Sequence, residues 1–246
     1  MDEDELQLHE LMLRGGRVRL FRFRSFTDLF IHELVTNQFW FSSKKHLNDP
    51  CEGIFHHGDN HPAPREYPHL KKFTVCCLTQ TNNNLMMWAH YADNHKGVCL
   101  ELDVMVSSGT HNGYHGPQKI HYSEHPPAVE QVIDRVDKKG HRSGQLIKYI
   151  QSDPDSTKST LWEHEKEFRL TGFNDGPNDA GHLVPLGDNI KIIGVYFGLK
   201  AQQYQIDILD RILDSKIPFY QASDVITSYD VEFSPLSRSS LDANLR

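Results

Sequence analysis

Acidic and basic side chains crowd into one short segment, residues 162–169 (WEHEKEFR). If a strand begins within this segment, alternation places Glu165, Glu167 and Arg169 on one face. A carboxylate fixed there would bind a ribose hydroxyl or stabilise positive charge, as carboxylates do beside oxocarbenium-like transition states. Arg169 would hold that carboxylate in its ionised form. A solvated strand edge is the alternative interpretation. Glu165 and Glu167 are therefore the candidate catalytic residues.

Arginines near the start of the chain form a second candidate site. Arg22 and Arg24 lie in the run RVRLFRFRS, whose alternation predicts a strand. If Phe21 and Phe23 are the buried pair of this strand, both arginines share its opposite face. That face is either exposed to solvent or forms the wall of an anionic pocket.

An aromatic segment, Trp88-Ala89-His90-Tyr91, forms a third candidate. It falls within a helix predicted from about residue 83 to 93. One interpretation is an aromatic core face with a single hydrogen-bonded histidine. The other is a platform for a planar ring such as nicotinamide or a base, with His90 or Tyr91 as a donor. We expect Trp88 to be buried and His90 or Tyr91 to face a cleft, because neighbouring helix positions point about 100° apart.

Short strands separated by few helices must position these residues. The periodicity predicts helices at 28–35, 83–93 and 201–213, and strands at 39–43, 73–78, 98–104, 167–173, 191–197, 217–221 and 229–233. Residues 56–70 are expected to be irregular and 107–117 to be loop. Helical spacing of apolar and charged residues predicts a helical insertion at 128–151.

This pattern predicts an α+β fold, with mixed or antiparallel sheets of short strands and flanking helices, rather than a doubly wound sheet. We expect one domain spanning residues 1–246. Its expected parts are an acidic N-terminal segment (1–15), a loop and helical insertion (107–157) and a tail (235–246).

The composition excludes several classes of protein. The 246 residues carry 26 Lys and Arg against 33 Asp and Glu, a formal charge of −7, whereas non-specific nucleic-acid binding draws on a basic surface. No apolar run approaches the roughly 18 residues of a membrane span, and the acidic start is unlike a secretory signal. The four cysteines form no spaced framework, which favours reduced thiols in the cytoplasm. We expect a cytoplasmic protein without a membrane partner.

Several catalytic motifs do not occur in the sequence. The 16 histidines are accompanied by neither C-x-x-C nor H-E-x-x-H, so no metal site is expected. G-x-G-x-x-G, the P-loop lysine motif and the G-x-S-x-G elbow are also missing. These absences argue against the usual Rossmann dehydrogenases, P-loop nucleotide hydrolases and α/β-hydrolases.

Five segments together resemble the bacterial family catalogued as domain of unknown function 2971. In order, they are LFRFRS, FWFSSKKHLNDPCE, MWAHYADNHKGVCLELD, KSTLWEHEKEFRL and IIGVYFG, between about residues 18 and 233. The chain departs from the family at Cys51 and Ala89, where members often have an aromatic residue and a serine. The resemblance implies a component of a mobile or anti-phage defence system.

The order of the polar residues also resembles the layout of the ADP-ribosyltransferase superfamily. That superfamily has Arg or His on its first core strand, a hydroxyl residue on the second and Glu at the start of a later strand. Arg24, Ser42 or Ser43, and Glu165 or Glu167 follow this order. The resemblance implies an ADP-ribosyltransferase-like fold that binds NAD, orients the dinucleotide and holds its ribose. The candidate residues for binding NAD are Arg22, Arg24, Ser42, Ser43, Asn48, Asp49, Trp88, His90, Tyr91 and Arg169.

The leading hypothesis is therefore an enzyme that splits the nicotinamide–ribose bond of NAD. It would transfer ADP-ribose to a protein, a nucleic acid or water, as a toxin or effector in a bacterial or phage-defence setting. A non-catalytic nucleotide-sensing or partner-binding module is the first alternative. A nuclease is the second, and it would recruit Asp49, Glu52, Glu101 and Asp103.

Overall fold

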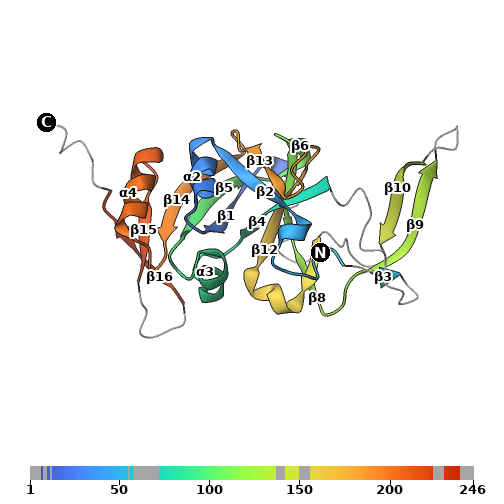
Figure 1. Cartoon of the computed structure of the whole chain (residues 1–246), viewed down its shortest axis with the longest axis horizontal. Helices are drawn as coiled ribbons and strands as arrows, with labels where there is room; N and C mark the ends of the chain where they lie inside the picture. Colours follow the sequence, from blue (N-terminus) through green and yellow to red (C-terminus); the bar gives the residue numbers. More distant parts are fainter. Residues whose placement is uncertain are drawn as a thin grey trace.

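A large, mostly antiparallel sheet organises the chain (Figure 1). The computed structural model describes residues 7, 10–11, 13–54, 56–57, 72–136, 142–149, 156–223 and 230–238. The strands of the sheet are β1 (Arg17–Arg24), β2 (Gln38–Ser43), β4 (Phe73–Thr79), β5 (Val98–Met105), β6 (Ser107–His111), β7 (Tyr114–Lys119), β12 (Glu167–Phe173), β13 (Gly181–Pro185), β14 (Ile190–Phe197), β15 (Phe219–Ser223) and β16 (Glu232–Leu236). Its order is β16-β15-β14-β5-β1-β4-β12-β7-β6, with β2 pairing both β4 and β13.

Smaller elements surround this sheet. The helices are α2 (Asp28–Val35), α3 (Leu85–Tyr91) and α4 (Gln203–Ile212), with 3-10 turns η1 (Lys44–His46) and η4 (Thr160–Glu165). One minor sheet joins β3 (His56–His57), β9 (Ala128–Val136) and β10 (Arg142–Tyr149), and another joins β8 (His121–Ser123) and β11 (Thr157–Ser159). The predicted α+β class, with a mixed and mostly antiparallel sheet, is confirmed.

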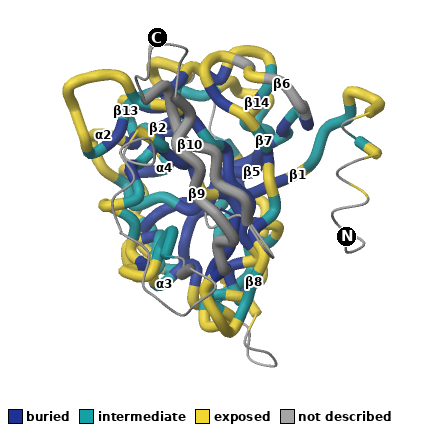
Figure 2. Tube along the Cα trace, turned by 90° about the vertical axis from the view of Figure 1, so that its right-hand side faces the viewer, coloured by how far each residue is buried: buried dark blue, intermediate teal, exposed yellow. Residues whose placement is uncertain are grey.

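The two faces of β1 belong to different hydrophobic clusters. Leu20 packs with Phe30 of α2 in the larger cluster. Phe21 and Phe23 pack with Trp88 of α3 in the smaller one. Because side chains alternate along a strand, α2 and α3 cover opposite faces of the same strand. In Figure 2 the central strands β1 and β5 are mostly buried, whereas exposed residues lie mainly in the turns.

Helix α2 forms as the sequence predicts. The side chain of Thr27 accepts a hydrogen bond from the Phe30 backbone N–H, which caps the first turn. Asn37 leaves the helix at φ 52°, in the left-handed region that Asn tolerates. This short helix brings β1 and β2 to the same part of the sheet.

Three predictions about secondary structure were wrong. Residues 107–117 are not loop but contain β6 and most of β7, because pairing of β7 with β12 overrides the weak strand propensity of Gly, Ser and His. The expected helical insertion at 128–151 is instead the antiparallel pair β9 and β10, in line with its β-branched Val and Ile residues and its glycines. The last strand is displaced to Glu232–Leu236. Predictions for residues 1–6, 58–71 and 239–246 lie outside the described residues.

Candidate active site

The main sheet splits between β1 and β2, and the split forms a cavity. One edge of β4 pairs with β1 only at Phe21↔Thr79 and with β2 at Ser42↔Val75 and Ser43↔Thr74. Between these contacts, residues 76–78 have no registered partner on that edge among the described strands. Cys76, Cys77 and Leu78 line the cavity instead.

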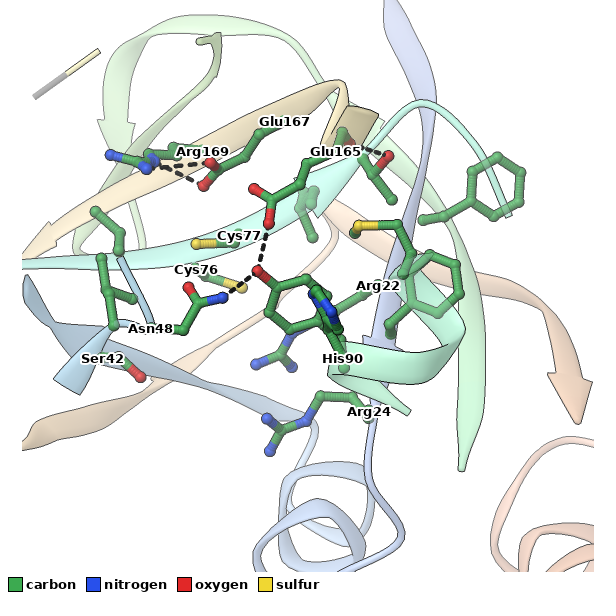
Figure 3. Close-up of a pocket in the computed structure, with 18 of the residues that line it drawn as sticks. Arg22, Arg24, Ser42, Asn48, Cys76, Cys77, His90, Glu165, Glu167 and Arg169 are labelled. Atoms are coloured by element: carbon green, nitrogen blue, oxygen red, sulfur yellow. Dashed lines mark hydrogen bonds and ion pairs between the residues drawn. The ribbon is translucent and has the colours of Figure 1, made fainter. Parts of the chain in front are cut away.

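The cavity has a volume of about 320 Å³. Strands β1, β2, β4, β11 and β12 contribute to its wall, together with α3, η4 and the loop after η1. Figure 3 shows polar side chains from these elements converging on the open space. Nine of the predicted site residues line it: Arg22, Arg24, Ser42, Asn48, His90, Tyr91, Glu165, Glu167 and Arg169.

Three predicted binding residues lie outside the lining. Ser43 is buried within the β2–β4 pair. The Asp49 carboxylate accepts a hydrogen bond from the Cys51 backbone N–H and so shapes the loop. Trp88 is completely buried, as expected, and its indole N–H donates to the Asn82 carbonyl. Trp88 thus anchors the helix that carries His90 and Tyr91.

Arg22 and Arg24 form one end of the cavity, here called the arginine end. Both guanidinium groups pair with the buried Glu33 of α2, at 3.0 Å and 2.6 Å. The same carboxylate accepts the Trp40 backbone N–H. The alternative of a solvated face is wrong for Arg22, which is 5% exposed.

The arginine end has an excess of positive charge, because two guanidinium groups share one carboxylate. Burial and the neighbouring charge of Arg22 lower the pKa of Arg24. The buried Arg24 Nε also has no hydrogen-bond acceptor among the described residues. An anion entering the cavity would supply both the missing charge and the missing acceptor.

Glu165 lies on the opposite wall, at the centre of a hydrogen-bond chain. Asn48 donates to the Tyr91 hydroxyl, and that hydroxyl donates to Glu165 Oε1. Lys158 Nζ lies 2.5 Å from Glu165 Oε2. Burial and the hydrogen bond to Glu165 raise the pKa of Tyr91, so its phenol stays protonated and keeps donating. Burial alone would lower the pKa of Lys158, but the carboxylates of Glu167 and Glu165 raise it.

Glu167 contacts two cationic side chains, Arg169 and Lys158, whereas Glu165 contacts Lys158. Arg169 Nε and Nη2 donate to its two oxygens at 2.7 Å and 3.1 Å, and Lys158 Nζ lies 3.2 Å away. Burial would raise the pKa of Glu167, but these cations outweigh it and lower the pKa to about 2. Arg169 also pairs with Glu52. We call Glu52, Glu165 and Glu167, with Lys158 and Arg169, the carboxylate end of the cavity.

The backbone between the two candidate glutamates is not the strand that would place Glu165 and Glu167 on one face by alternation. Glu165 ends the 3-10 turn η4, and Glu167 begins β12. Lys166 between them has φ 45°, a left-handed conformation. Both carboxylates still line the cavity. At 3% exposure each, they do not form a solvated strand edge.

Two residues of this ionic arrangement were not predicted from the sequence. Lys158 precedes η4 and pairs with both glutamates. Glu33 is 1% exposed and neutralises part of the arginine end. The detectable signal for Glu33 is a charge on the apolar face of α2, between the buried residues Phe30 and Leu34. Nothing in the periodicity marks Lys158.

The acids that a nuclease would recruit have separate partners. Glu101 pairs with Arg19 and accepts from the Tyr196 hydroxyl, and Asp103 pairs with Arg17. Within the described part of the chain, no group of three or more His, Cys, Asp or Glu side chains is arranged to hold a metal ion. All four cysteines are free thiols. No helix among the described residues has the length and apolar character to cross a bilayer.

Comparison with known families and structures gives one match. Residues 87–170 match the family described as "Protein of unknown function (DUF2971)", which confirms the family resemblance over that stretch. The matched stretch contains five residues of the cavity: Tyr91, Lys158, Glu165, Glu167 and Arg169. No curated protein and no solved structure matches the chain.

Proposed function

We propose that this chain, whose residues 87–170 match the DUF2971 family, cleaves NAD between nicotinamide and ribose. It would transfer the ADP-ribose to a protein, a nucleic acid or water. One observation carries the proposal. The buried carboxylate of Glu165, hydrogen-bonded by Tyr91, lies in the same cavity as the arginine pair of β1.

The charges of the cavity complement those of NAD. The diphosphate of NAD is anionic and suits the arginine end, where Arg24 Nε needs an acceptor. The nicotinamide ring of NAD is cationic and suits the carboxylate end, where the described residues place three carboxylates against two cationic side chains. A volume of about 320 Å³ falls within the range of ligand pockets, roughly 300–1,000 Å³.

Glu165 would support the bond-breaking step. The C–N bond breaks with its electron pair going to the ring nitrogen, so neutral nicotinamide leaves and the ribose becomes an oxocarbenium ion. One oxygen of Glu165 accepts from Tyr91 and the other from Lys158, and each keeps a second lone pair. One of these lone pairs would accept a hydrogen bond from the ribose 2′-hydroxyl. The acceptor's nucleophile then bonds to the ribose and releases a proton. Fixed negative charge near the developing cation lowers the barrier.

Glu167 would have a supporting role. Its two oxygens are held by Arg169 and Lys158, so it fixes the lysine that in turn orients Glu165. This order of elements, with Arg24 on β1, Ser42 on β2 and Glu165 before β12, supports an ADP-ribosyltransferase-like arrangement. The family resemblance supports a toxin or effector role in bacterial or phage defence.

A nucleotide-binding module without catalysis is the second candidate. The observation that favours it is that cations already hold both carboxylates: Lys158 pairs with Glu165 and Glu167, and Arg169 pairs with Glu167 and lowers its pKa. Such a module would bind NAD or another nucleotide through the arginine end and leave it intact.

Incubation of the pure protein with NAD, followed by mass spectrometry of released nicotinamide, tests the proposal. We expect Glu165→Gln to reduce turnover by about 10²–10³-fold, the scale for losing one electrostatic stabiliser, with the fold retained by circular dichroism. Glu163→Gln is the matched control, because Glu163 is exposed on the same turn. Full activity of E165Q would overturn the proposal. NAD binding without nicotinamide release would favour the binding module.

A further inference from the structure

Glu52 is a buried carboxylate with one free oxygen in the wall of the cavity. Its side chain is 2% exposed, and its Oε1 pairs with Arg169 Nη1. Its Oε2 is buried and has no hydrogen-bond partner among the described residues. A buried carboxylate oxygen without a donor is costly. The proposed bond-breaking step at Glu165 does not use this oxygen.

The charges of the described residues around Glu52 do not compensate for its unpaired oxygen. Arg169 is shared between Glu52 and Glu167, and Lys158 is shared between Glu167 and Glu165. Among the described residues, three carboxylates therefore share two cations at the carboxylate end. A ligand that brings a hydrogen-bond donor to Glu52 would relieve this imbalance, whereas a ligand that brings a second anion would increase it.

The loop that carries Glu52 has a defined shape. The Asp49 side chain accepts from the Cys51 N–H at 2.8 Å, and the Asp49 carbonyl accepts from the Glu52 N–H at 3.2 Å. Asn48 of the same loop donates to the Tyr91 hydroxyl. The loop thus connects Glu52 to the hydrogen-bond chain that ends at Glu165.

The order of groups across the cavity indicates which part of a ligand reaches Glu52. In Figure 3, Arg24 and Arg169 lie at opposite ends of the view, and the Glu165 carboxylate projects into the open space. The Tyr91 hydroxyl donates to that carboxylate. With the diphosphate at the arginine end and the ribose at Glu165, the nicotinamide ring would extend toward Arg169 and its partner Glu52. The carboxamide of that ring carries an NH₂ donor.

We propose that Glu52 Oε2 accepts a hydrogen bond from the nicotinamide carboxamide and makes the cavity selective for an amide over a carboxylate at that position. The inference rests on the proposed NAD site. It assigns Glu52 to substrate selection and not to bond cleavage. Nicotinic acid adenine dinucleotide, which has a carboxylate in place of the carboxamide, should therefore be rejected.

Calorimetric titration of both dinucleotides tests the inference, with E165Q as the background so that the ligands stay intact. We expect NAD to bind about 10- to 100-fold more tightly than its acid analogue, the scale for a hydrogen bond to a charged group. Adding Glu52→Gln should bring the two affinities within about threefold. The glutamine has the shape of the glutamate, but its neutral amide does not repel the carboxylate of the acid analogue. Glu101→Gln is the matched control. Glu101 is also buried and ion-paired, but it does not line the cavity, so this variant should keep the discrimination.

A failure limited to this inference can be distinguished from a failure of the proposed function. An unchanged ratio in the Glu52→Gln variant would overturn the role of Glu52, while nicotinamide release by the wild type would leave the proposed function intact. If neither dinucleotide binds, both proposals fail. If Glu52→Gln does not fold, Glu52→Asp keeps a charge for Arg169 and withdraws the carboxylate by one methylene. Undiminished discrimination in that variant would also overturn the inference.

Discussion

We expect the free energy of unfolding to fall in acid as Glu167 becomes protonated, because two cations stabilise its ionised form in the folded protein. Arg169 and Lys158 lower the pKa of Glu167 from 4.5 to about 2. Above pH 4.5 the carboxylate is ionised in both the folded and unfolded chains, and its ion pairs contribute fully to stability. As the pH falls toward 2, the unfolded chain takes up the proton first, so that contribution is lost. A shift of about 2.5 pKa units corresponds to about 3 kcal/mol.

The variant Glu167→Gln removes this contribution at every pH. We expect it to lower the free energy of unfolding by about 3–5 kcal/mol at pH 7, the usual cost of removing one partner from a buried ion pair. The gap between variant and wild type should shrink by about 3 kcal/mol between pH 5 and pH 2. Urea denaturation followed by circular dichroism at several pH values measures this gap. The exposed Glu163→Gln should follow the wild type throughout.

The same series contains the result that would refute the reasoning. A gap that stays constant between pH 5 and pH 2 would mean that Glu167 has an ordinary pKa in the folded protein. The cations around it, Arg169 and Lys158, would then not form the ionic arrangement on which the proposed support of Glu165 depends.

Two further predictions address the helix and the arginine end. Trp88→Ala should lower the free energy of unfolding by about 3–5 kcal/mol, because Trp88 is fully buried against Phe23. His90 is exposed, so His90→Ala should change the free energy of unfolding by less than about 0.5 kcal/mol. Equal losses for the two variants in urea denaturation would contradict the assignment of Trp88 as the anchor of α3. Arg24→Gln should weaken binding of ADP-ribose by about tenfold or more in calorimetry, since it removes one charge-assisted contact to the diphosphate, and an unchanged affinity would contradict an anion-binding arginine end.

Local patterns in the sequence were sufficient to predict much of the sheet. The alternation in RVRLFRFRS predicts both β1 and the shared face of Arg22 and Arg24. Helix α2 has a cap at Thr27 and a left-handed exit at Asn37, and both are residue types that favour those positions. The strand predicted at 167–173 has the bounds of β12.

Periodicity failed where pairing partners decide the structure. The residues of β9 and β10 alternate poorly, so their apolar positions fit a helical spacing as well as a strand. Residues 107–117 are rich in Gly, Ser and His and became strands because neighbouring strands offered hydrogen-bond partners. The cavity itself was not predictable from periodicity, because it depends on where β1 and β2 part from β4.

The division of roles between Glu165 and Glu167 follows from one residue between them. On a continuous strand the two carboxylates would face the same partners, and the sequence could not separate them. The left-handed Lys166 breaks that equivalence, at a cost of about 1 kcal/mol for a residue with a Cβ. It leaves Glu165 beside the Tyr91 hydroxyl, whereas Glu167 enters the sheet beside Arg169. The chain thereby holds one carboxylate beside an exchangeable hydroxyl partner and the other in a rigid bidentate pair. That asymmetry is the arrangement expected when one acid contacts a ligand and the other holds it in position.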